Sequence, residues 1–237
     1  MLDQELNVKT AVVLMGGEGL RLKPLTNDRP KAMVEVGGRR LVDWVLYWLA
    51  KNSIEKVVIG VAYRKEKIID YVGAGEKYGM RVEYSHHTVE GGTAQGFRWA
   101  IDSYVDDDTF LAMNGDELTN VSVQDLAGHH IAKGATATIA VSPLRCPFGV
   151  VRVQGHDIIG FDEKPLIDSL LVSVGVYVFQ KEILDYLPEF GDIEKTAFPR
   201  LAAERKLKAY RYDGFWMTVN TVKDLQEVDK WIKGMGI

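Results

Sequence analysis

Cysteine is nearly absent from this chain of 237 residues, in which Cys146 stands alone. A single thiol excludes an intrachain disulfide and a metal site built from several cysteines. The chain also lacks any apolar run of the length that crosses a bilayer. Its first ten residues, MLDQELNVKT, carry acidic side chains and no apolar core, so we expect no signal peptide. These absences together predict a cytoplasmic protein without a membrane partner.

An excess of charge of one sign is missing as well. The chain has 29 Lys and Arg against 33 Asp and Glu, which gives a formal net charge of −4. A nucleic-acid-binding protein usually carries a basic stripe, so we expect no nucleic-acid partner. Hydrophobic residues at 46% and charged residues at 26% are ordinary for a globular protein. The length suits one domain over residues 1–237.

The first half of the chain alternates between two kinds of pattern. Short apolar runs predict strands at 10–15, 56–61, 81–85 and 109–114. Helical spacing falls between them, at 41–52, 65–72 and 94–102. This order predicts an α/β fold with a doubly wound, mostly parallel, Rossmann-like sheet. Ligands bind such sheets beyond the carboxyl ends of the strands, where Gly16 and Asp116 both fall.

The second half has more strands and fewer helices. Strands are expected at 135–141, 149–153, 158–161 and 170–179, and helices at 194–204 and 221–233. We therefore expect one body with a first half of about residues 1–134 and a smaller, mixed-strand second half of about residues 135–237. No linker rich in Gly, Ser or Pro separates the two halves.

The most informative segment is residues 14–31, LMGGEGLRLKPLTNDRPK, directly after the first strand. Glycines let the backbone approach a ligand closely, and successive N–H groups form an anion-binding concavity. Arg and Lys add the charge and geometry that phosphate oxygens require. The segment therefore predicts a polyphosphate site. Its candidate residues are Leu14, Gly16, Gly17, Gly19, Arg21 and Lys31.

Two familiar phosphate motifs do not fit this loop. Gly17 and Gly19 are not followed by the third glycine of a dinucleotide fingerprint, and no Gly-Lys-Ser/Thr of a P-loop is present. Taken alone, the glycines suit a plain strand-to-helix turn equally well. The order of the whole string, with Arg21, a proline, Thr26, a second proline and Lys31, is more specific.

This string resembles the signature of the sugar-1-phosphate nucleotidyltransferases, and the resemblance covers nearly all of the chain. The family joins a nucleoside triphosphate to a sugar 1-phosphate and releases pyrophosphate. The resemblance implies that the first half binds the nucleotide and the second half binds the sugar. It also implies that Arg21 contacts the triphosphate and that Lys31 bridges the leaving pyrophosphate or the sugar phosphate. A solvated surface cation is the alternative for each residue.

The chemistry of nucleotidyl transfer brings one anion against another, so catalysis depends on positioning and on cations. Asp116 follows Gly115 at the end of the strand 109–114. The family's Gly-Asp carries a divalent metal at this point, usually Mg²⁺, so the resemblance implies that Asp116 is a catalytic metal ligand. A turn cap is the alternative role. We expect the adjacent Glu117 to be an exposed acid.

A second block concerns the nucleobase. Residues 90–94, EGGTA, resemble the family's Pro-Leu-Gly-Thr-Ala, which implies that Gly92 and Thr93 lie against the base. A helix cap by Thr93 is compatible with the same geometry. The adjacent His86 and His87 point to opposite sides of a strand, which argues against a shared metal. We assign His87 to the base.

Three further matches concern the sugar. Residues 161–165, FDEKP, match a Glu-Lys-Pro block, which implies that Glu163 binds a sugar hydroxyl and Lys164 the sugar's phosphate. Gly149 matches a glycine whose backbone lines the sugar site. Ser173 stands in Ser-Val-Gly where the family often has Asn-Ala-Gly, so its contact with a sugar hydroxyl is weaker or different. A surface turn is the alternative for the FDEKP block.

The chain departs from the family pattern at the second metal ligand. Many members have Trp-x-Asp-x-Gly-Thr, whose Asp is the second metal ligand and falls here on Thr218. Cytidylyltransferase-like members have an Asp where Asn220 stands. An amide oxygen can still bind a hard cation, so we place Asn220 beside Asp116 at the metal. Leu20 also replaces a usual Thr or Ser.

The function that we favour is Mg²⁺-dependent transfer of a nucleotidyl group from an NTP to a hexose 1-phosphate, which forms an NDP-sugar. Mannose 1-phosphate guanylyl transfer is preferred slightly. Glucose 1-phosphate uridylyl, thymidylyl or cytidylyl transfer stays open, as does a homo-oligomer. A non-catalytic regulatory subunit that binds nucleotide sugars is a rival supported by the missing second Asp. A glycosyltransferase is disfavoured because no Asp-x-Asp follows the strand 109–114.

Overall fold

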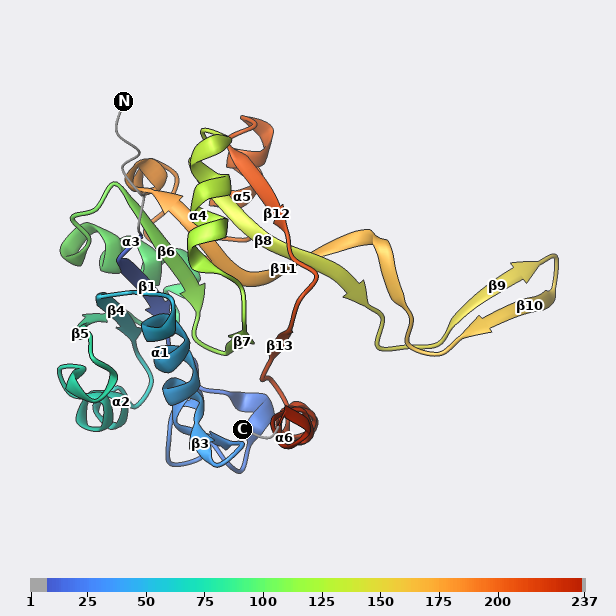
Figure 1. Cartoon of the computed structure of the whole chain (residues 1–237), viewed down its shortest axis with the longest axis horizontal. Helices are drawn as coiled ribbons and strands as arrows, with labels where there is room; N and C mark the ends of the chain where they lie inside the picture. The colour runs from blue at the N-terminus through green and yellow to red at the C-terminus, as the bar shows by residue number, and fades with distance from the viewer. Residues whose placement is uncertain (1–7, 236–237) are drawn as a thin grey trace.

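A computed structural model describes residues 8–235, with side chains through residue 232. The expectation about a signal peptide therefore lies mainly outside the described residues. The centre of the molecule is a seven-stranded sheet in the order β12-β8-β11-β6-β1-β4-β5 (Figure 1). Among the described helices, none combines the length and apolar character that a membrane crossing requires.

The sheet is mostly parallel. The parallel group from the first half consists of β1 (Thr10–Leu14), β4 (Lys56–Val61), β5 (Arg81–His86) and β6 (Thr109–Asn114). From the second half, β11 (Leu166–Gln180) runs antiparallel between β6 and β8 (Ala137–Arg145), and β12 (Leu207–Arg211) is parallel to β8. This topology confirms the predicted α/β fold, and one sheet joins the two halves of the chain.

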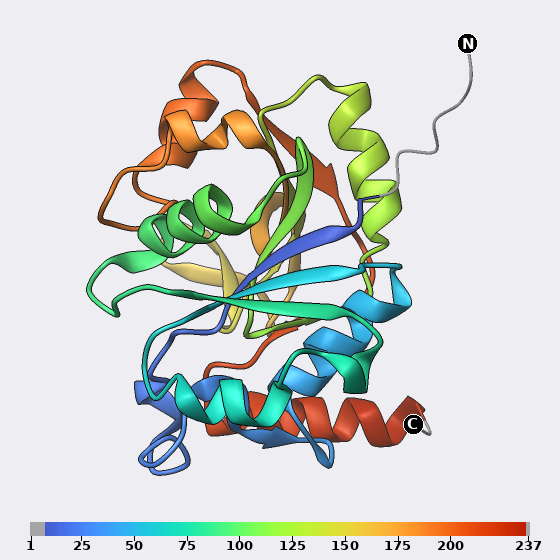
Figure 2. The same ribbon diagram turned by 90° about the vertical axis from the view of Figure 1, so that its left-hand side faces the viewer.

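Helices cover both faces of the sheet, as Figure 2 shows. They are α1 (Leu41–Lys51), α2 (Glu66–Val72), α3 (Gly92–Tyr104), α4 (Val123–Ala132), α5 (Ala197–Ala203) and α6 (Val222–Met235). Each face has its own apolar core. One core includes Leu46 and Leu49 of α1 with Leu126 of α4, and the other includes Phe97 of α3 with Leu201 of α5. Two cores on opposite faces are what double winding produces.

Sequence reasoning missed α4 and β12. The helix α4 contains Gly128 and two adjacent histidines, which weaken its local helical signal. Ser122 nevertheless caps the helix, since its side chain accepts a hydrogen bond from the backbone N–H of Asp125. His130 is buried, with Nδ1 2.9 Å from the hydroxyl of Thr138. Tertiary packing therefore decides these elements more than local propensity does.

Aromatic side chains fill the core between α3 and β11. Phe97 packs edge to face against Tyr177 and Phe179, whose rings stack with centroids 5.6 Å apart. We expect Phe97→Ala to lower the free energy of unfolding by about 3–5 kcal/mol, because it removes a buried ring and leaves a cavity. Urea denaturation followed by circular dichroism measures the change. Phe190→Ala removes an exposed ring and is the matched control, so equal losses in the two variants would contradict this packing.

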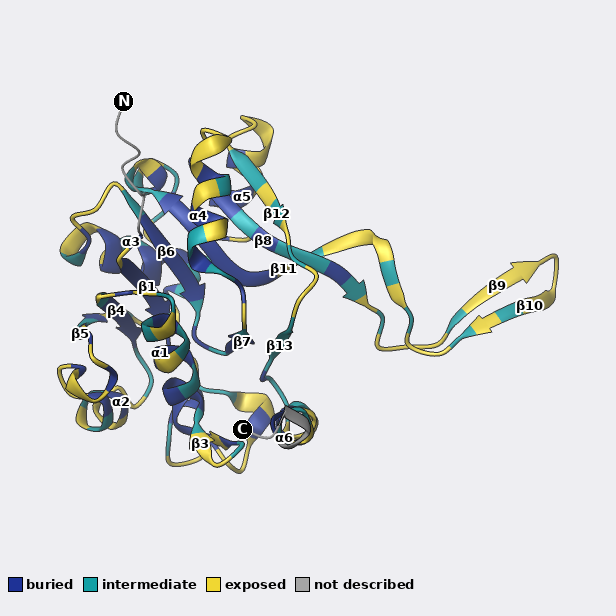
Figure 3. Cartoon of the chain, in the orientation of Figure 1, coloured by how far each residue is buried: buried dark blue, intermediate teal, exposed yellow. Residues whose placement is uncertain are grey.

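A two-stranded ribbon extends from the body of the molecule (Figure 1). Its strands β9 (Val150–Gln154) and β10 (Asp157–Asp162) pair antiparallel, and β8 and β11 lead to it and from it. We call residues 146–165 the ribbon arm. Most of its surface is exposed to solvent (Figure 3).

Candidate active site

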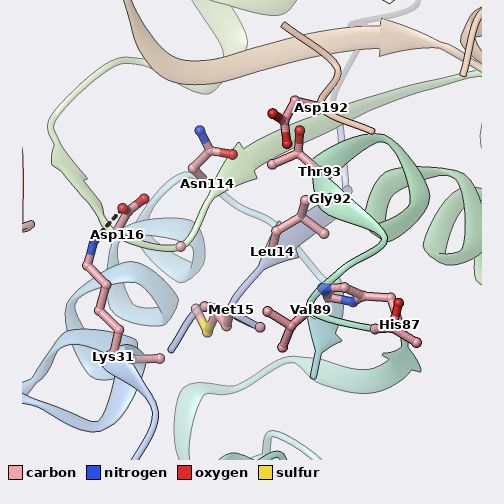
Figure 4. A pocket seen from close by; sticks show the side chains of 15 residues that line it. Leu14, Met15, Lys31, His87, Val89, Gly92, Thr93, Asn114, Asp116 and Asp192 are labelled. Atoms are coloured by element: carbon pink, nitrogen blue, oxygen red, sulfur yellow. Dashed lines mark hydrogen bonds and ion pairs between the residues drawn. The ribbon is translucent and has the colours of Figure 1, made fainter. Parts of the chain in front are cut away.

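A cavity of about 360 Å³ opens at the carboxyl ends of β1 and β6 (Figure 4). The register of these strands places Leu14 opposite Asn114, so the loops that follow both strands start at the same edge of the sheet. Eight of the residues predicted from the sequence line this one cavity. They are Leu14, Gly16, Gly17, Lys31, His87, Gly92, Thr93 and Asp116.

The glycine-rich loop folds back on itself before it reaches Lys31. Gly19 takes a left-handed conformation, with φ +66°, which favours glycine. Its carbonyl oxygen accepts a hydrogen bond from the hydroxyl of buried Thr26 at 2.8 Å. Leu22 is fully buried and fixes the middle of the loop to the body. The conformation therefore explains why Gly19 and Thr26 occur in the string that carries the family resemblance.

Lys31 joins the two predicted metal ligands. Its ammonium donates to Asp116 Oδ2 at 2.5 Å and to Asn220 Oδ1 at 2.7 Å, and it is only 9% exposed. In Figure 4 the Lys31 side chain extends to Asp116 at one side of the cavity. Asp116 comes from the loop after β6, and Asn220 from the loop between β13 (Trp216–Thr218) and α6. Two oxygen atoms from distant parts of the chain thus converge on one cation.

Glu117 is buried, so the expectation of an exposed acid was wrong. It begins β7 (Glu117–Thr119), where it pairs with Thr218 of β13. Its carboxylate accepts hydrogen bonds from the Trp216 indole at 2.8 Å and from the Thr218 hydroxyl at 3.0 Å. Burial, together with the adjacent charge of Asp116, raises the pKa of Glu117 to about 8.

A chain of hydrogen bonds connects Glu117 to the cavity. The Thr218 hydroxyl donates to Glu117 and accepts from Asn220 Nδ2 at 3.3 Å. Because its NH₂ group is held by Thr218, the Asn220 amide directs its oxygen toward Lys31. Thr218, the residue at the missing Asp, therefore links a buried carboxylate to Asn220 and determines which way the Asn220 amide faces.

These residues fit a magnesium site that uses few protein ligands. Mg²⁺ is commonly held by one or two carboxylates together with substrate phosphates and water. Asp116 and Asn220 supply one carboxylate and one amide oxygen, and the Lys31 ammonium demonstrates that both oxygens can reach one cation. No cluster of three or more His, Cys, Asp or Glu side chains suited to a metal occurs within residues 8–235. Phosphate oxygens would complete the coordination.

Neither Asp213 nor Asp224 replaces the missing carboxylate. Asp224 accepts hydrogen bonds from the backbone N–H groups of Asn220 and Thr221 and so fixes the loop before α6. Asp213 forms an ion pair with Arg211, 3.0 Å away at the surface. Both carboxylates are therefore committed to other partners.

Glycines surround the His87 ring. A Cβ atom on Gly16 would lie 2.5 Å from His87 Nε2, and Gly60 and Gly96 also face the ring closely. Burial, and secondarily the charge of His86, lowers the pKa of His87 to about 4, so the ring is neutral at physiological pH. His87 Nδ1 finds no hydrogen-bond partner in the part of the chain that the structure describes. The ring forms a flat, neutral wall of the cavity.

The start of α3 also lines the cavity. Gly92 has φ +71° and packs against the backbone of Gly191. The Thr93 hydroxyl donates to Glu194 at 3.0 Å and accepts from the backbone N–H of Ile193 at 2.9 Å. Thr93 lies inside α3, and the cap position belongs to Gly91. Thr93 therefore ties the start of this helix to a loop from the second half of the chain.

Seven predicted residues do not line the cavity. One of them, Asn220, is bonded to the lining residue Lys31. Gly19 and Arg21 lie in the neighbouring loop, where Arg21 is exposed and forms no hydrogen bond or ion pair within the described residues. Ser173 lies on β11 and accepts a hydrogen bond from the backbone N–H of Gly175. Gly149, Glu163 and Lys164 lie on the ribbon arm, away from the body.

Sequence reasoning missed other residues of the cavity wall. They are Met15, Ala32, Thr88, Val89, Asn114, Gly115 and Asp192. Asn114 had a usable signal, because it is a polar residue at the carboxyl end of a buried strand. Asp192 had none: it reaches the cavity because its loop packs on α3, which is about 90 residues earlier in the chain.

Comparison with known proteins places this geometry in a family. The family description "Nucleotidyl transferase" matches residues 10–233. The chain belongs to this family. A mannose-1-phosphate guanylyltransferase catalytic subunit beta of Dictyostelium discoideum is 35% identical over 234 residues, which cover 96% of this chain and 64% of that protein. The chain therefore spans slightly less than two thirds of that relative's length.

Another relative and a solved structure match nearly end to end. A "probable glucose-1-phosphate cytidylyltransferase" of Bacillus subtilis is 29% identical and is covered over 98% of its length, with 96% of this chain. HddC of Yersinia pseudotuberculosis, solved in complex with GMP-PN, superposes with a TM-score of 0.74 at 20% identity. The match covers 94% of this chain and 99% of HddC. At that identity, the likeness shows a shared fold.

We expect Thr218→Val to weaken Mg²⁺-dependent nucleotide binding or activity about 10- to 100-fold, the scale of losing a residue that orients a ligand. Valine cannot hold the Asn220 amide, so its oxygen is no longer fixed toward the cavity. Mg²⁺ titrations of nucleotide binding measure the effect. Thr218→Ser keeps the hydroxyl and should restore the wild-type titration; an unchanged titration in Thr218→Val would contradict the orienting role.

Proposed function

We propose that this protein transfers a nucleotidyl group from a nucleoside triphosphate to a hexose 1-phosphate. The observation that carries this proposal is the convergence of the glycine-rich loop, Lys31 and Asp116 on one cavity, with Asn220 bonded to Lys31 beside it. Family membership supports the reaction class. The names of the Dictyostelium and Bacillus relatives state different sugars and different bases. The substrate pair of this chain is therefore a separate question.

The first step is binding of the nucleotide. The triphosphate lies along the backbone N–H groups of Gly16 and Gly17, which line the cavity. The base occupies the space between neutral His87 and the start of α3 at Gly92. Asp116 and Asn220 would hold Mg²⁺, which would supply positive charge to the phosphates.

The second step is an in-line displacement. An oxygen of the sugar phosphate bonds to the α-phosphorus, and the bond from the α-phosphorus to the α–β bridging oxygen breaks, so pyrophosphate leaves with the electron pair. Lys31 moves from its contact with Asp116 to the phosphates and offsets their charge. The sugar phosphate attacks the nucleotide directly, so no side chain acts as a nucleophile and no covalent enzyme intermediate is required.

We favour GTP with mannose 1-phosphate as the substrate pair, supported by the 35% identity to the Dictyostelium guanylyltransferase. Glucose 1-phosphate with CTP is the alternative, supported by the match to the Bacillus protein over nearly the full length of both chains. Chromatography of products from each NTP paired with each sugar 1-phosphate, with Mg²⁺, separates these alternatives. A GDP-hexose formed only from mannose 1-phosphate is expected; formation of CDP-glucose alone would overturn the preferred pair.

A regulatory subunit that binds nucleotide sugars is the competing function. Its support is specific: Thr218 and Asn220 stand at the two positions where the family pattern has a second carboxylate. The hydrogen-bond chain from Glu117 to Asn220 argues for a working site, because it keeps an oxygen ligand aimed at the cation position. Folded protein that binds nucleotide sugar but forms no product with any pair would favour the regulatory function.

A further inference from the structure

A second cavity, of about 370 Å³, lies between α1, α2 and the hairpin of β2 (Glu35–Val36) and β3 (Arg39–Arg40). It shares no lining residue with the cavity proposed as the active site. We call it the arginine pocket. We propose that the arginine pocket is a separate site that binds a small molecule through a phosphate group. Its charged lining residues are Glu35, Arg39, Arg40, Asp43 and Lys77.

The carboxylate of Asp43 is fully used inside the protein. Its side chain is only 5% exposed, and Oδ1 accepts hydrogen bonds from Lys77 Nζ and from the Tyr78 hydroxyl, both at 2.7 Å. Oδ2 accepts from the Tyr71 hydroxyl at 2.8 Å and from the backbone N–H of Arg40 at 3.2 Å. Burial acts to raise the pKa of this carboxyl, but the side-chain hydrogen bonds outweigh burial and lower the pKa, so the group is charged. Asp43 and Lys77 therefore neutralise each other.

The two arginines lie on aromatic rings and do not pair with acids. The guanidinium carbon of Arg40 is 3.8 Å from the centroid of the Tyr71 ring. That of Arg39 is 5.2 Å from the centroids of both Trp44 and Tyr47. In the described part of the chain, neither guanidinium forms an ion pair or donates a hydrogen bond. Stacking leaves the N–H donors of a guanidinium available in its plane, so both arginines can still bind oxygen atoms.

Buried contacts hold these rings in place. Asp43 fixes Tyr71 and Tyr78 through their hydroxyl groups. Tyr47 packs edge to face on Tyr78, with ring centroids 5.2 Å apart. The Trp44 indole donates a hydrogen bond to a backbone carbonyl of β2 at 2.9 Å. The surfaces under both guanidiniums are therefore set before any ligand binds, which reduces the entropy lost on binding.

The charges that remain favour an oxyanion. Once Asp43 and Lys77 are paired, two guanidiniums face a single carboxylate, that of the exposed Glu35, so positive charge is in excess. Glu35 is opposite Arg40 in the hairpin, but the two side chains form no ion pair within the described residues. Two adjacent guanidiniums can share the several oxygen atoms of one phosphate group. A volume of about 370 Å³ is within the range of small-molecule sites, so the pocket suits a small phosphorylated molecule.

Nuclear magnetic resonance of the tryptophan indoles tests the site directly. Trp44 lies under Arg39, and its indole signal is assigned by its loss in Trp44→Phe. Titration of inorganic phosphate into isotope-labelled wild-type protein, at constant ionic strength, is expected to shift this signal until it saturates in the millimolar range or below. The signal of Trp99, an exposed residue of α3, should stay in place. A Trp44 signal that phosphate does not move, or that moves without saturating, would overturn the proposal.

Two substitutions are expected to change the affinity in opposite directions. Arg40→Gln should weaken phosphate binding about ten-fold, the scale of one lost hydrogen-bonded charge contact. Glu35→Gln should strengthen it by roughly two- to five-fold, because it removes the unpaired carboxylate that repels the anion. A merely structural role of Glu35 would not produce tighter binding, so unchanged or weaker binding in Glu35→Gln would contradict the assigned charge balance.

Arg64→Gln is the matched control. Arg64 is another exposed arginine on a tyrosine ring, 5.4 Å from the Tyr63 centroid, and it does not line the pocket. This variant should keep the wild-type affinity for phosphate. Equal weakening in Arg40→Gln and Arg64→Gln would mean that phosphate responds only to net charge, and it would overturn a specific site.

The arginine pocket is independent of nucleotidyl transfer. The phosphate titration needs no turnover, and neither Arg40 nor Glu35 lines the proposed active site. A protein that forms no product with any substrate pair would therefore remove the proposed function and leave the titration to decide the pocket. An active protein whose Trp44 signal ignores phosphate would keep the function and remove the pocket.

Discussion

Asp116→Asn is expected to lower kcat by roughly 10²- to 10³-fold, the scale for losing one preorganised charge at a reacting phosphate. The substitution preserves shape and removes the only carboxylate in direct contact with Lys31 within the described residues. The dependence of activity on Mg²⁺ should shift to higher concentration or disappear, because an amide holds a divalent cation less strongly than a carboxylate. Steady-state kinetics over a Mg²⁺ titration measure both effects.

The matched control is Asp106→Asn, which removes one charge from a fully exposed side chain. Both variants should remain folded, although Asp116→Asn also removes the ion pair with Lys31. An Asp116→Asn enzyme with unchanged kcat and an unchanged Mg²⁺ titration would remove Asp116 from the metal site.

Arg21→Ala is expected to lower kcat by roughly 10²- to 10³-fold as well. The Arg21 side chain is exposed and has no partner in the described part of the chain, so its guanidinium is free to fold over the bound triphosphate. A flexible cation that meets its anion only in the complex affects the chemical step more than the stability of the protein. Pre-steady-state measurement of the chemical step separates this effect from slower product release.

Lys23→Ala is the control for Arg21→Ala, because Lys23 is an exposed cation two residues away in the same loop. If Arg21 acted only through the general positive potential of the loop, kcat would fall to a similar degree in both variants. A specific role of Arg21 leaves Lys23→Ala near the wild type. Wild-type turnover in Arg21→Ala would end the assigned role.

The sequence was most informative about the elements that form the carboxyl edge of the sheet. The strands at 10–15 and 109–114 were predicted to within one residue, since continuous apolar runs have few alternatives. Parallel strands bring such ends together, so the prediction that Gly16 and Asp116 share a cleft followed from the order of the elements.

Long-range packing explains what the sequence did not reveal. Nothing near Glu117 in the sequence announces that Trp216 and Thr218, about 100 residues later, bury its carboxylate. Asp192 likewise reaches the cavity through a loop whose position depends on α3. The departures at Thr218 and Asn220 were visible as missing carboxylates, but only the structure showed that they form one hydrogen-bond chain with Glu117.

The direction of the ribbon arm was the least predictable feature. The sequence predicted its two strands at 149–153 and 158–161, close to the observed bounds of β9 and β10. It also predicted that Glu163 and Lys164 serve the sugar phosphate, which stays a prediction. The alternation of side chains along a strand determines which of them share a face. It does not determine the direction of a ribbon that leaves the sheet.

The most direct test of nucleotidyl transfer follows the α-phosphate of the nucleotide. Wild-type protein with Mg²⁺ is incubated with an NTP labelled at the α-phosphate and with a sugar 1-phosphate, and the products are separated. The account predicts that the label moves into a nucleotide sugar in step with the release of unlabelled pyrophosphate, and only when both substrates are present. Label that stays in the NTP with every substrate pair, or that appears in free NMP or NDP without a sugar, would contradict it.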